Sequence, residues 1–270
     1  MCWSQQVSWG FAVAEALSLL LLCRLAGGFA GPVKHMRPLL ASICLIEVLE
    51  AFVWPTVSGS SAGNRCGISC GSGNRFITLA IFANLSVQPL LVNLAALALA
   101  KLAKAQPQRE AFEITSRMAA ALAVCFLGAL ALGEVAEVDI VPFEATGKLG
   151  MHATETCSLL GAHGHLHWVF KMSANFMLPN GFAYVLMMLP PLFARPWHLL
   201  AAPLGAYLAI FAGLFFSMGY SFEAGSVWCW SAIGLHCYAY IMCLFARQRR
   251  KTAEVSHRRT QRRNKLRRRS

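Results

Sequence analysis

Seven long hydrophobic stretches, separated by polar intervals, dominate the chain. Each is close to the roughly 20 residues that a helix needs to cross a hydrocarbon layer about 30 Å thick. Apolar and polar residues do not alternate along them as they do in the strands of a membrane barrel, so the pattern predicts helices. The expected spans are residues 7–23, 38–57, 77–100, 118–138, 173–194, 198–220 and 226–246.

This pattern predicts an all-α integral membrane protein, with a bundle of about seven transmembrane helices in residues 1–246 and a tail in residues 247–270. The first stretch is interpreted as a retained helix rather than a secretory signal. No positive charge precedes it, and Glu15 interrupts its apolar core. The composition agrees, because 57% of the residues are hydrophobic and only 13% are charged.

The tail holds half of the basic residues. Of the 24 Lys and Arg in the chain, 12 lie after residue 246 together with a single acid, Glu254, which leaves 12 basic and 11 acidic residues in the body. The formal charge of +12 therefore does not indicate nucleic-acid binding, which would need a basic, soluble domain. We expect a disordered cytoplasmic tail whose partners are the lipid bilayer and its anionic headgroups.

Basic residues in the short loops predict the same orientation. With a non-cytoplasmic N-terminus and seven spans, the cytoplasmic side carries twice as many loop Lys and Arg as the opposite side, as the positive-inside rule requires. The cytoplasmic set is Arg24, Lys34, Arg37, Lys101, Lys104, Arg109, Arg117 and Arg195, and the opposite set is Arg65, Arg75, Lys148 and Lys171.

Three carboxyl groups lie within the predicted spans, where an ionisable residue costs about 2.5–3.5 kcal/mol and is a functional candidate for that reason. They are Glu15, Glu47 and Glu50. Glu47 and Glu50 are three residues apart, so they share a helical face. Because two neighbouring carboxylates are not both ionised readily in a low dielectric, we expect proton-linked behaviour of this pair.

Amide side chains follow one face of the third stretch. Asn84 and Gln88 are four residues apart, Asn93 continues toward the cytoplasmic end, and Pro89 removes a backbone donor. These amides either line a ligand cavity or bond to neighbouring helices, each pair contributing about 0.6 kcal/mol, and the second interpretation is favoured. Glu134, near the end of the fourth stretch, is a further candidate for ligand or proton binding.

The densest histidine cluster precedes the fifth stretch and consists of His163, His165 and His167. In a helix His163 and His167 would have a two-ligand spacing for zinc, although Gly164 disfavours a helix; in an extended segment all three could share a face. A zinc site, a pH-sensing site and a simple interfacial belt are the three interpretations.

Half of the ten cysteines map to the non-cytoplasmic side, where disulfides form if that side is oxidising. We expect either Cys66 or Cys70 to pair with Cys157, joining the second and fourth loops. Zinc is the competing interpretation for the Cys-x3-Cys spacing, but no second cysteine pair completes such a site.

Five segments together resemble a family of multi-pass membrane proteins of uncharacterised function. They are Met1-Cys2-Trp3-Ser4, the stretch from Glu47 to Trp54, Gln88-Pro89, Gly164-His165-Leu166-His167-Trp168, and Ser226-Val227-Trp228-Cys229-Trp230. The resemblance spans most of the chain and implies the class of protein only, with no activity, substrate or site.

Three functional hypotheses follow. The favoured one is a small-solute or proton- or cation-linked transporter or channel-like protein, with Glu47 and Glu50 as binding groups and no catalytic residues. The first alternative is a membrane-embedded, metal-dependent lipid hydrolase that uses the histidine cluster as zinc ligands and a carboxylate as base. The second is a membrane scaffold or assembly protein, in which the polar residues only hold helices together.

Overall fold

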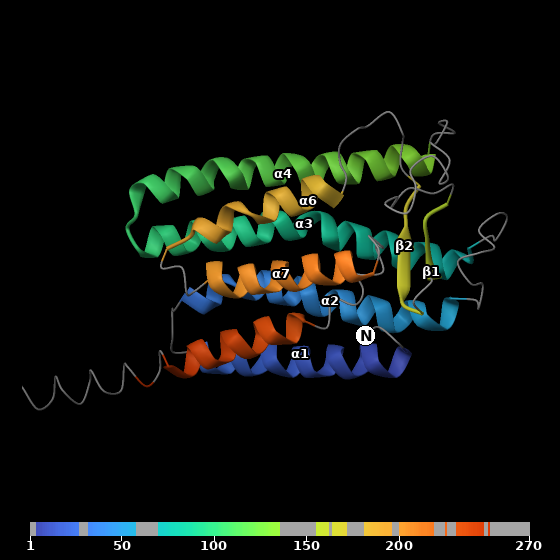
Figure 1. Cartoon of the computed structure of the whole chain (residues 1–270), viewed down its shortest axis with the longest axis horizontal. Coiled ribbons are helices and arrows are strands. Elements are labelled where there is room, and N and C mark those ends of the chain that lie inside the picture. The colour runs from blue at the N-terminus through green and yellow to red at the C-terminus, as the bar shows by residue number, and fades with distance from the viewer. Residues whose placement is uncertain are drawn as a thin grey trace, which may run out of the picture.

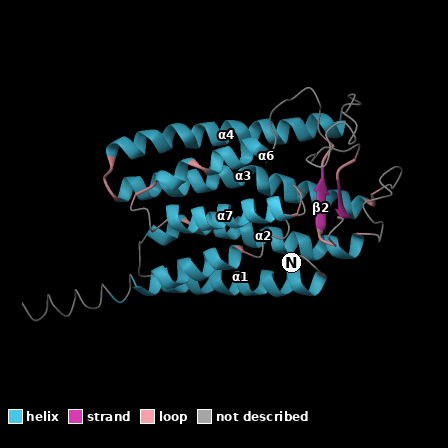
Figure 2. Cartoon of the chain, viewed as in Figure 1, coloured by secondary structure: helices cyan, strands magenta, loops and turns pink. Residues whose placement is uncertain are grey.

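The computed structural model describes residues 4–26, 32–57, 70–135, 155–161, 164–171, 181–195, 200–218, 225, 231–245 and 248. Most of these residues are helical, and the helices run along the long axis of the molecule, with a short two-stranded sheet at one end (Figures 1 and 2). The prediction of a predominantly helical chain is confirmed. The sheet is an addition to the all-α fold that the hydrophobic pattern predicted.

Among the residues that the structure describes, four helices are long and apolar enough to cross a membrane. They are α1 (Gln5–Ala26), α2 (Arg37–Val53, continued by the 3-10 turn η2, Trp54–Thr56), α3 (Ser72–Leu102) and α4 (Gln106–Val135). Each packs against the next one along the chain. The short turn η1 (Pro32–His35) precedes α2, whose second residue, Pro38, has the fixed φ that suits a first helical turn.

The described part of the chain also contains three shorter apolar helices. They are α6 (Gly181–Met188), which is followed by the 3-10 turn η4 (Pro190–Phe193), α7 (Ala201–Ser217), and the helix Ala232–Phe245, which we call the C-terminal helix. Figure 1 shows α6 in front of α3 and α4, and the C-terminal helix, in red, beside α1. These helices lie within the fifth, sixth and seventh predicted spans, but the described part of each is shorter than 18 residues.

The fourth helix differs most from its predicted bounds. Hydrophobicity placed its start at Met118, whereas α4 begins twelve residues earlier, at Gln106. Its first turns carry exposed polar pairs at helical spacing: Gln106 donates to Glu110, and Arg109 donates to Glu113 at 2.9 Å. Such i,i+4 pairs support a helix in water, so the helix extends beyond its hydrophobic stretch.

The sheet is an antiparallel hairpin of β1 (Cys157–Leu160) and β2 (Leu166–Val169), in which Leu159 lies opposite His167. Gly164 in its connection has a φ of +78°, a conformation that glycine adopts without a Cβ clash. The Gly161 amide donates to the His165 carbonyl at 2.8 Å. The histidine tract is thus extended rather than helical over its described residues.

The interior of the bundle contains many polar side chains, while large hydrophobic side chains lie on its surface. Among the described residues, Glu15, Glu47, Glu50, Asn93 and His236 have no exposed surface at all. The exposed side chains of the helices include Val13, Leu17, Leu20, Leu45, Phe52, Ile114, Val124, Leu132, Phe193, Ile210, Phe216, Ile241 and Phe245.

Candidate functional site

Three helices bring ionisable side chains together inside the bundle. Glu15 comes from α1, Glu47 from α2 and His236 from the C-terminal helix. The Glu15 Oε2 atom lies 3.8 Å from His236 Nε2, and the two carboxylates are close enough to interact electrostatically. All three side chains are fully buried. We call Glu15, Glu47 and His236 the carboxylate–imidazole cluster.

The packing of α1 against α2 explains why the two carboxylates meet. Cys44 lies one turn before Glu47, and its thiol donates to the Ala12 carbonyl of α1 at 3.7 Å. The same thiol lies within electrostatic reach of Glu15 and Glu47. Glu50 lies one turn beyond Glu47 on α2 and is also fully buried.

Neither Glu15 nor Glu47 has a hydrogen-bond donor for its carboxyl oxygens among the described residues. Hydrogen bonds or an opposite charge normally compensate a buried carboxylate, because removing an isolated charge from water is costly. A bound proton or a small cation would lower that cost. The imidazole beside Glu15 can accept or donate a proton, so the cluster has the parts needed to bind and pass on protons.

His236 is the member of the cluster that the sequence analysis did not select. It is an ionisable residue within an apolar stretch, and the rule that singled out Glu15 applies to it equally. The histidine candidates were placed instead in the denser tract around His165. The contact with Glu15 could not be inferred, because it joins the first helix to the last one across 221 positions of the chain.

The amides of α3 are bonded to other helices. Asn84 and Ser42 of α2 exchange two hydrogen bonds, of 2.7 Å and 2.6 Å, and Asn93 donates to the Pro89 and Met187 carbonyls at 2.7 Å and 2.8 Å. Gln88 accepts a 2.5 Å hydrogen bond from the Tyr184 hydroxyl of α6. These contacts favour the interpretation of the amides as ties between helices.

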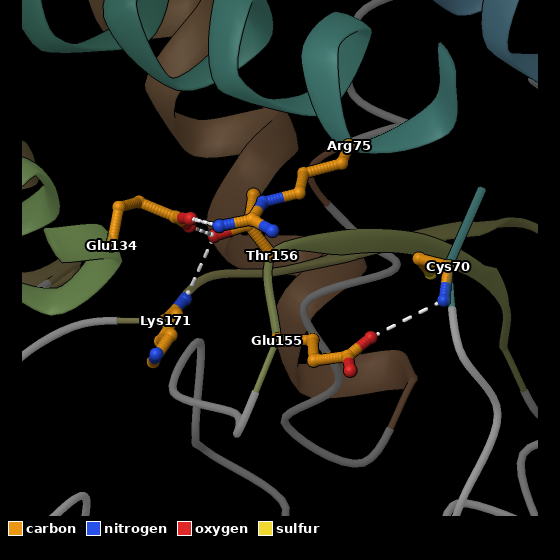
Figure 3. A network of polar contacts seen from close by, with 6 residues as sticks. All are labelled: Cys70, Arg75, Glu134, Glu155, Thr156 and Lys171. Carbon is orange, nitrogen blue, oxygen red and sulfur yellow. Dashed lines mark hydrogen bonds and ion pairs between the residues drawn. The ribbon is translucent and has the colours of Figure 1, made fainter. Parts of the chain in front are cut away.

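Polar contacts also attach the hairpin to the ends of α3 and α4 (Figure 3). Glu134 of α4 pairs with Arg75 of α3 and accepts a hydrogen bond from Thr156, whose oxygen in turn accepts from the Lys171 amide at 2.9 Å. Glu134 is therefore part of the hairpin attachment, on a different part of the bundle from Glu15 and Glu47.

Asn74 makes the most complete of these attachments. Its side chain donates to the Ser158 carbonyl at 3.0 Å and accepts from the Ser158 amide at 2.8 Å, and Thr78 bonds to the Ser158 hydroxyl at 2.7 Å. All three side chains are buried. The hairpin is thus held by a side chain that satisfies both backbone groups of one residue.

A disulfide between Cys70 and Cys157 links the start of α3 to β1. It is one of the two pairings considered from the sequence, and Cys66 lies outside the described residues. Glu155 adds a contact on the same side, because its carboxylate accepts from the Cys70 amide at 3.2 Å (Figure 3). The covalent bond leaves Cys70 with no thiolate for a zinc ion.

The histidines of the hairpin belong to its turn and its second strand. His167 is buried and paired with Leu159, and His165 precedes β2. His163 lies outside the described residues, so a zinc site that uses all three stays a prediction. Over the part of the chain that the structure describes, no three His, Cys, Asp or Glu side chains are gathered closely enough to hold a metal ion.

The chain was compared with known protein families. The profile of a family of unknown function, DUF5765, matches residues 34–251. The chain belongs to this family. The resemblance to an uncharacterised family that its sequence suggested is thereby confirmed, although the match does not include the opening residues 1–4. DUF5765 covers Glu47, Glu50 and His236 but not Glu15. No curated protein and no solved structure matches the chain.

Proposed function

We propose that this chain is a seven-span membrane protein that carries protons, or a small solute or cation coupled to them, through the carboxylate–imidazole cluster. The N-terminus is non-cytoplasmic and the basic tail is cytoplasmic. The observation that carries the proposal is the burial of Glu15, Glu47 and His236 from three helices, with both carboxyl groups lacking hydrogen-bond donors among the described residues.

The arrangement of side chains across the bundle supports a lipid environment. Carboxylates, amides and an imidazole lie inside, while the outward faces carry large hydrophobic residues such as Val124, which is 71% exposed, and Phe193, which is 77% exposed. Water-soluble proteins rarely expose apolar surface on this scale. Hydrocarbon around the helices explains both halves of the pattern, because it solvates the outer faces and excludes charges from them.

The length of α7 supports one of the remaining three spans. The 17 residues of α7 extend for about 26 Å at 1.5 Å per residue, close to the hydrocarbon thickness of about 30 Å. The C-terminal helix contributes Ala232, Leu235 and Ala239 to the same hydrophobic core as Leu22 of α1. The same helix places His236 beside Glu15 of α1, so it lies alongside the first span, and seven crossings return the tail to the side of the basic loops.

Proton chemistry fits the cluster better than a structural role does. A purely structural polar contact within a membrane gains stability from hydrogen bonds, as Asn84 and Ser42 do. Glu15 and Glu47 lack such bonds and still carry the cost of burial. Binding and release of a proton would explain why these carboxyl groups are buried despite that cost. A carboxyl group that changes charge can couple ion movement to helix rearrangement.

The test is proton flux in liposomes that contain the purified full-length chain and an internal pH-sensitive dye. We expect flux in the wild type under an imposed pH gradient and loss of flux in Glu15→Gln, Glu47→Gln and His236→Gln. Each substitution keeps the approximate volume of the side chain and removes the titratable group. Sodium and potassium gradients applied in parallel distinguish a coupled cation from the proton alone.

The matched control is Glu113→Gln, which changes a carboxylate of α4 whose side chain is 34% exposed and paired with Arg109. This variant should retain wild-type flux. Solubilised yield and a single size-exclusion peak establish that each variant is folded. Unchanged flux in both Glu15→Gln and Glu47→Gln, in folded protein, would overturn the proposal.

A further inference from the structure

A groove separate from the carboxylate–imidazole cluster lies between α4, α6 and η4. It encloses about 560 Å³, a volume typical of sites that hold small organic molecules. Its walls are almost entirely apolar. The lining residues are Gln108, Ala111, Phe112, Thr115, Leu186, Met187, Leu189, Pro190 and Phe193.

The groove is open to the surface along its apolar part. Leu186, Leu189 and Phe193 are exposed, with Phe193 77% accessible, while Phe112 is buried. Thr115 brings little polarity, because its hydroxyl is directed to the Phe112 carbonyl of its own helix. If the outer surface contacts lipid as proposed, hydrocarbon chains are the molecules that meet this opening.

One end of the groove is polar and basic. The Gln108 side chain accepts a hydrogen bond from the Arg195 amide at 3.2 Å, which joins the start of α4 to a residue two positions beyond the end of η4. Arg195 is exposed, and it belongs to the basic set that the loop charges assign to the cytoplasmic side.

We propose that the groove binds one anionic phospholipid, with an acyl chain along Ala111, Phe112 and Leu186 and the headgroup phosphate at Arg195. Charge complementarity selects this occupant. A hydrocarbon chain gains little by leaving the bilayer for an apolar groove, so the preference must come from the headgroup. Guanidinium groups suit it because their planar set of donors matches phosphate oxygens.

The experiment is native mass spectrometry of the detergent-purified full-length chain, titrated with phosphatidylglycerol or with phosphatidylcholine of the same acyl chains. We expect one phosphatidylglycerol to bind about tenfold more tightly than phosphatidylcholine, because the choline cation of phosphatidylcholine offsets the attraction between its phosphate and the guanidinium group. Equal retention of both lipids would overturn the proposal. Equal competition by glycerol phosphate, which lacks acyl chains, would also overturn it, because the groove would then play no part.

Two variants examine the two ends of the site separately. Ala111→Trp fills the apolar part, and Arg195→Gln removes a headgroup cation; each should weaken phosphatidylglycerol binding about tenfold. The controls are Ala121→Trp, an exposed position of α4 outside the groove, and Lys101→Gln, an exposed cation of α3. Both controls should bind as the wild type does.

Two other results would overturn the proposal. One is equal loss of lipid in a site variant and in its control, which would indicate a general layer of surrounding lipid. The other is a wild-type dimer that Ala111→Trp converts to a monomer with lipid retention unchanged, which would assign the groove to a second copy of this chain.

Discussion

At the hairpin end of the bundle, Asn74 satisfies both backbone groups of Ser158, and Glu134 is held by Arg75 and Thr156. Within α1 and α2, Glu15 and Glu47 are buried more completely, yet their oxygens have no hydrogen-bond donor among the described residues. The two regions contain the same kinds of polar side chain. They differ in whether the protein itself supplies the partners.

This difference separates two uses of a buried polar group. Where donors and acceptors match, the side chain holds two elements in register, and removing it costs stability. Where they do not match, the group destabilises the fold unless it binds a proton or another ligand, so its burial points to such a ligand. Substitutions should therefore lower stability at the hairpin end and change activity, with little loss of stability, at the carboxylate–imidazole cluster.

The largest loss of stability should follow from Cys157→Ser. The Cys70–Cys157 disulfide closes a loop across 87 residues of sequence separation, and removing such a bond typically costs about 2–5 kcal/mol. Thermal unfolding in detergent should show the loss, and a reducing agent should bring the wild type to the level of the variant. Cys125→Ser, at a free and exposed cysteine, should leave the transition unchanged.

The next largest effect should come from Asn74→Ala. It removes the partner of both the Ser158 amide and carbonyl within a buried contact, and unsatisfied buried groups cost about 1–3 kcal/mol. Protease digestion should cleave the hairpin more quickly in this variant than in the wild type. A hairpin as resistant to protease as that of the wild type would show that the disulfide alone holds it in place.

A smaller loss should follow from Asn84→Ala, which removes the side-chain contact between α2 and α3. Polar contacts between helices within a bilayer, such as those of Asn84 with Ser42, contribute about 0.6 kcal/mol on average, because the same groups also find hydrogen-bond partners in the unfolded state within the membrane. Unfolding followed in bicelles can resolve this difference. Proton flux should persist in the variant, and its loss would show that Asn84 belongs to the transport pathway.

The smallest loss of stability should be found for Glu47→Gln. The change removes a buried carboxyl group that lacks donors among the described residues, so we expect an unfolding temperature equal to or above that of the wild type. The same variant should have no proton flux. A substantial fall in unfolding temperature would place Glu47 with the structural groups of the hairpin end and remove the contrast between the two regions.

The sequence predicted the helices more accurately than their ends. The first three hydrophobic stretches begin within five residues of α1, α2 and α3, because continuous apolar runs specify buried or lipid-facing helices. The start of α4 was misplaced by twelve residues, since hydrophobicity does not detect an exposed helix such as the one around Arg109. The hairpin went unpredicted, because four-residue strands carry too short a pattern.

The candidate site was predicted in part by the same reasoning. Glu15, Glu47 and Glu50 stood out because charged residues are costly within apolar segments, and this cost depends on sequence alone. The amides Asn84, Gln88 and Asn93 were placed on one helical face, but whether that face met a cavity or another helix depended on α2 and α6.

The sequence by itself determined that the chain is helical and which residues are costly to bury, because helical periodicity and hydrophobicity are properties of neighbouring residues. Only the tertiary structure decided which of these residues meet. The contact of Glu15 with His236 and the disulfide of Cys70 with Cys157 join parts of the chain far apart in sequence. Such pairings arise from how whole helices pack, and packing depends on the shape of every face in the bundle.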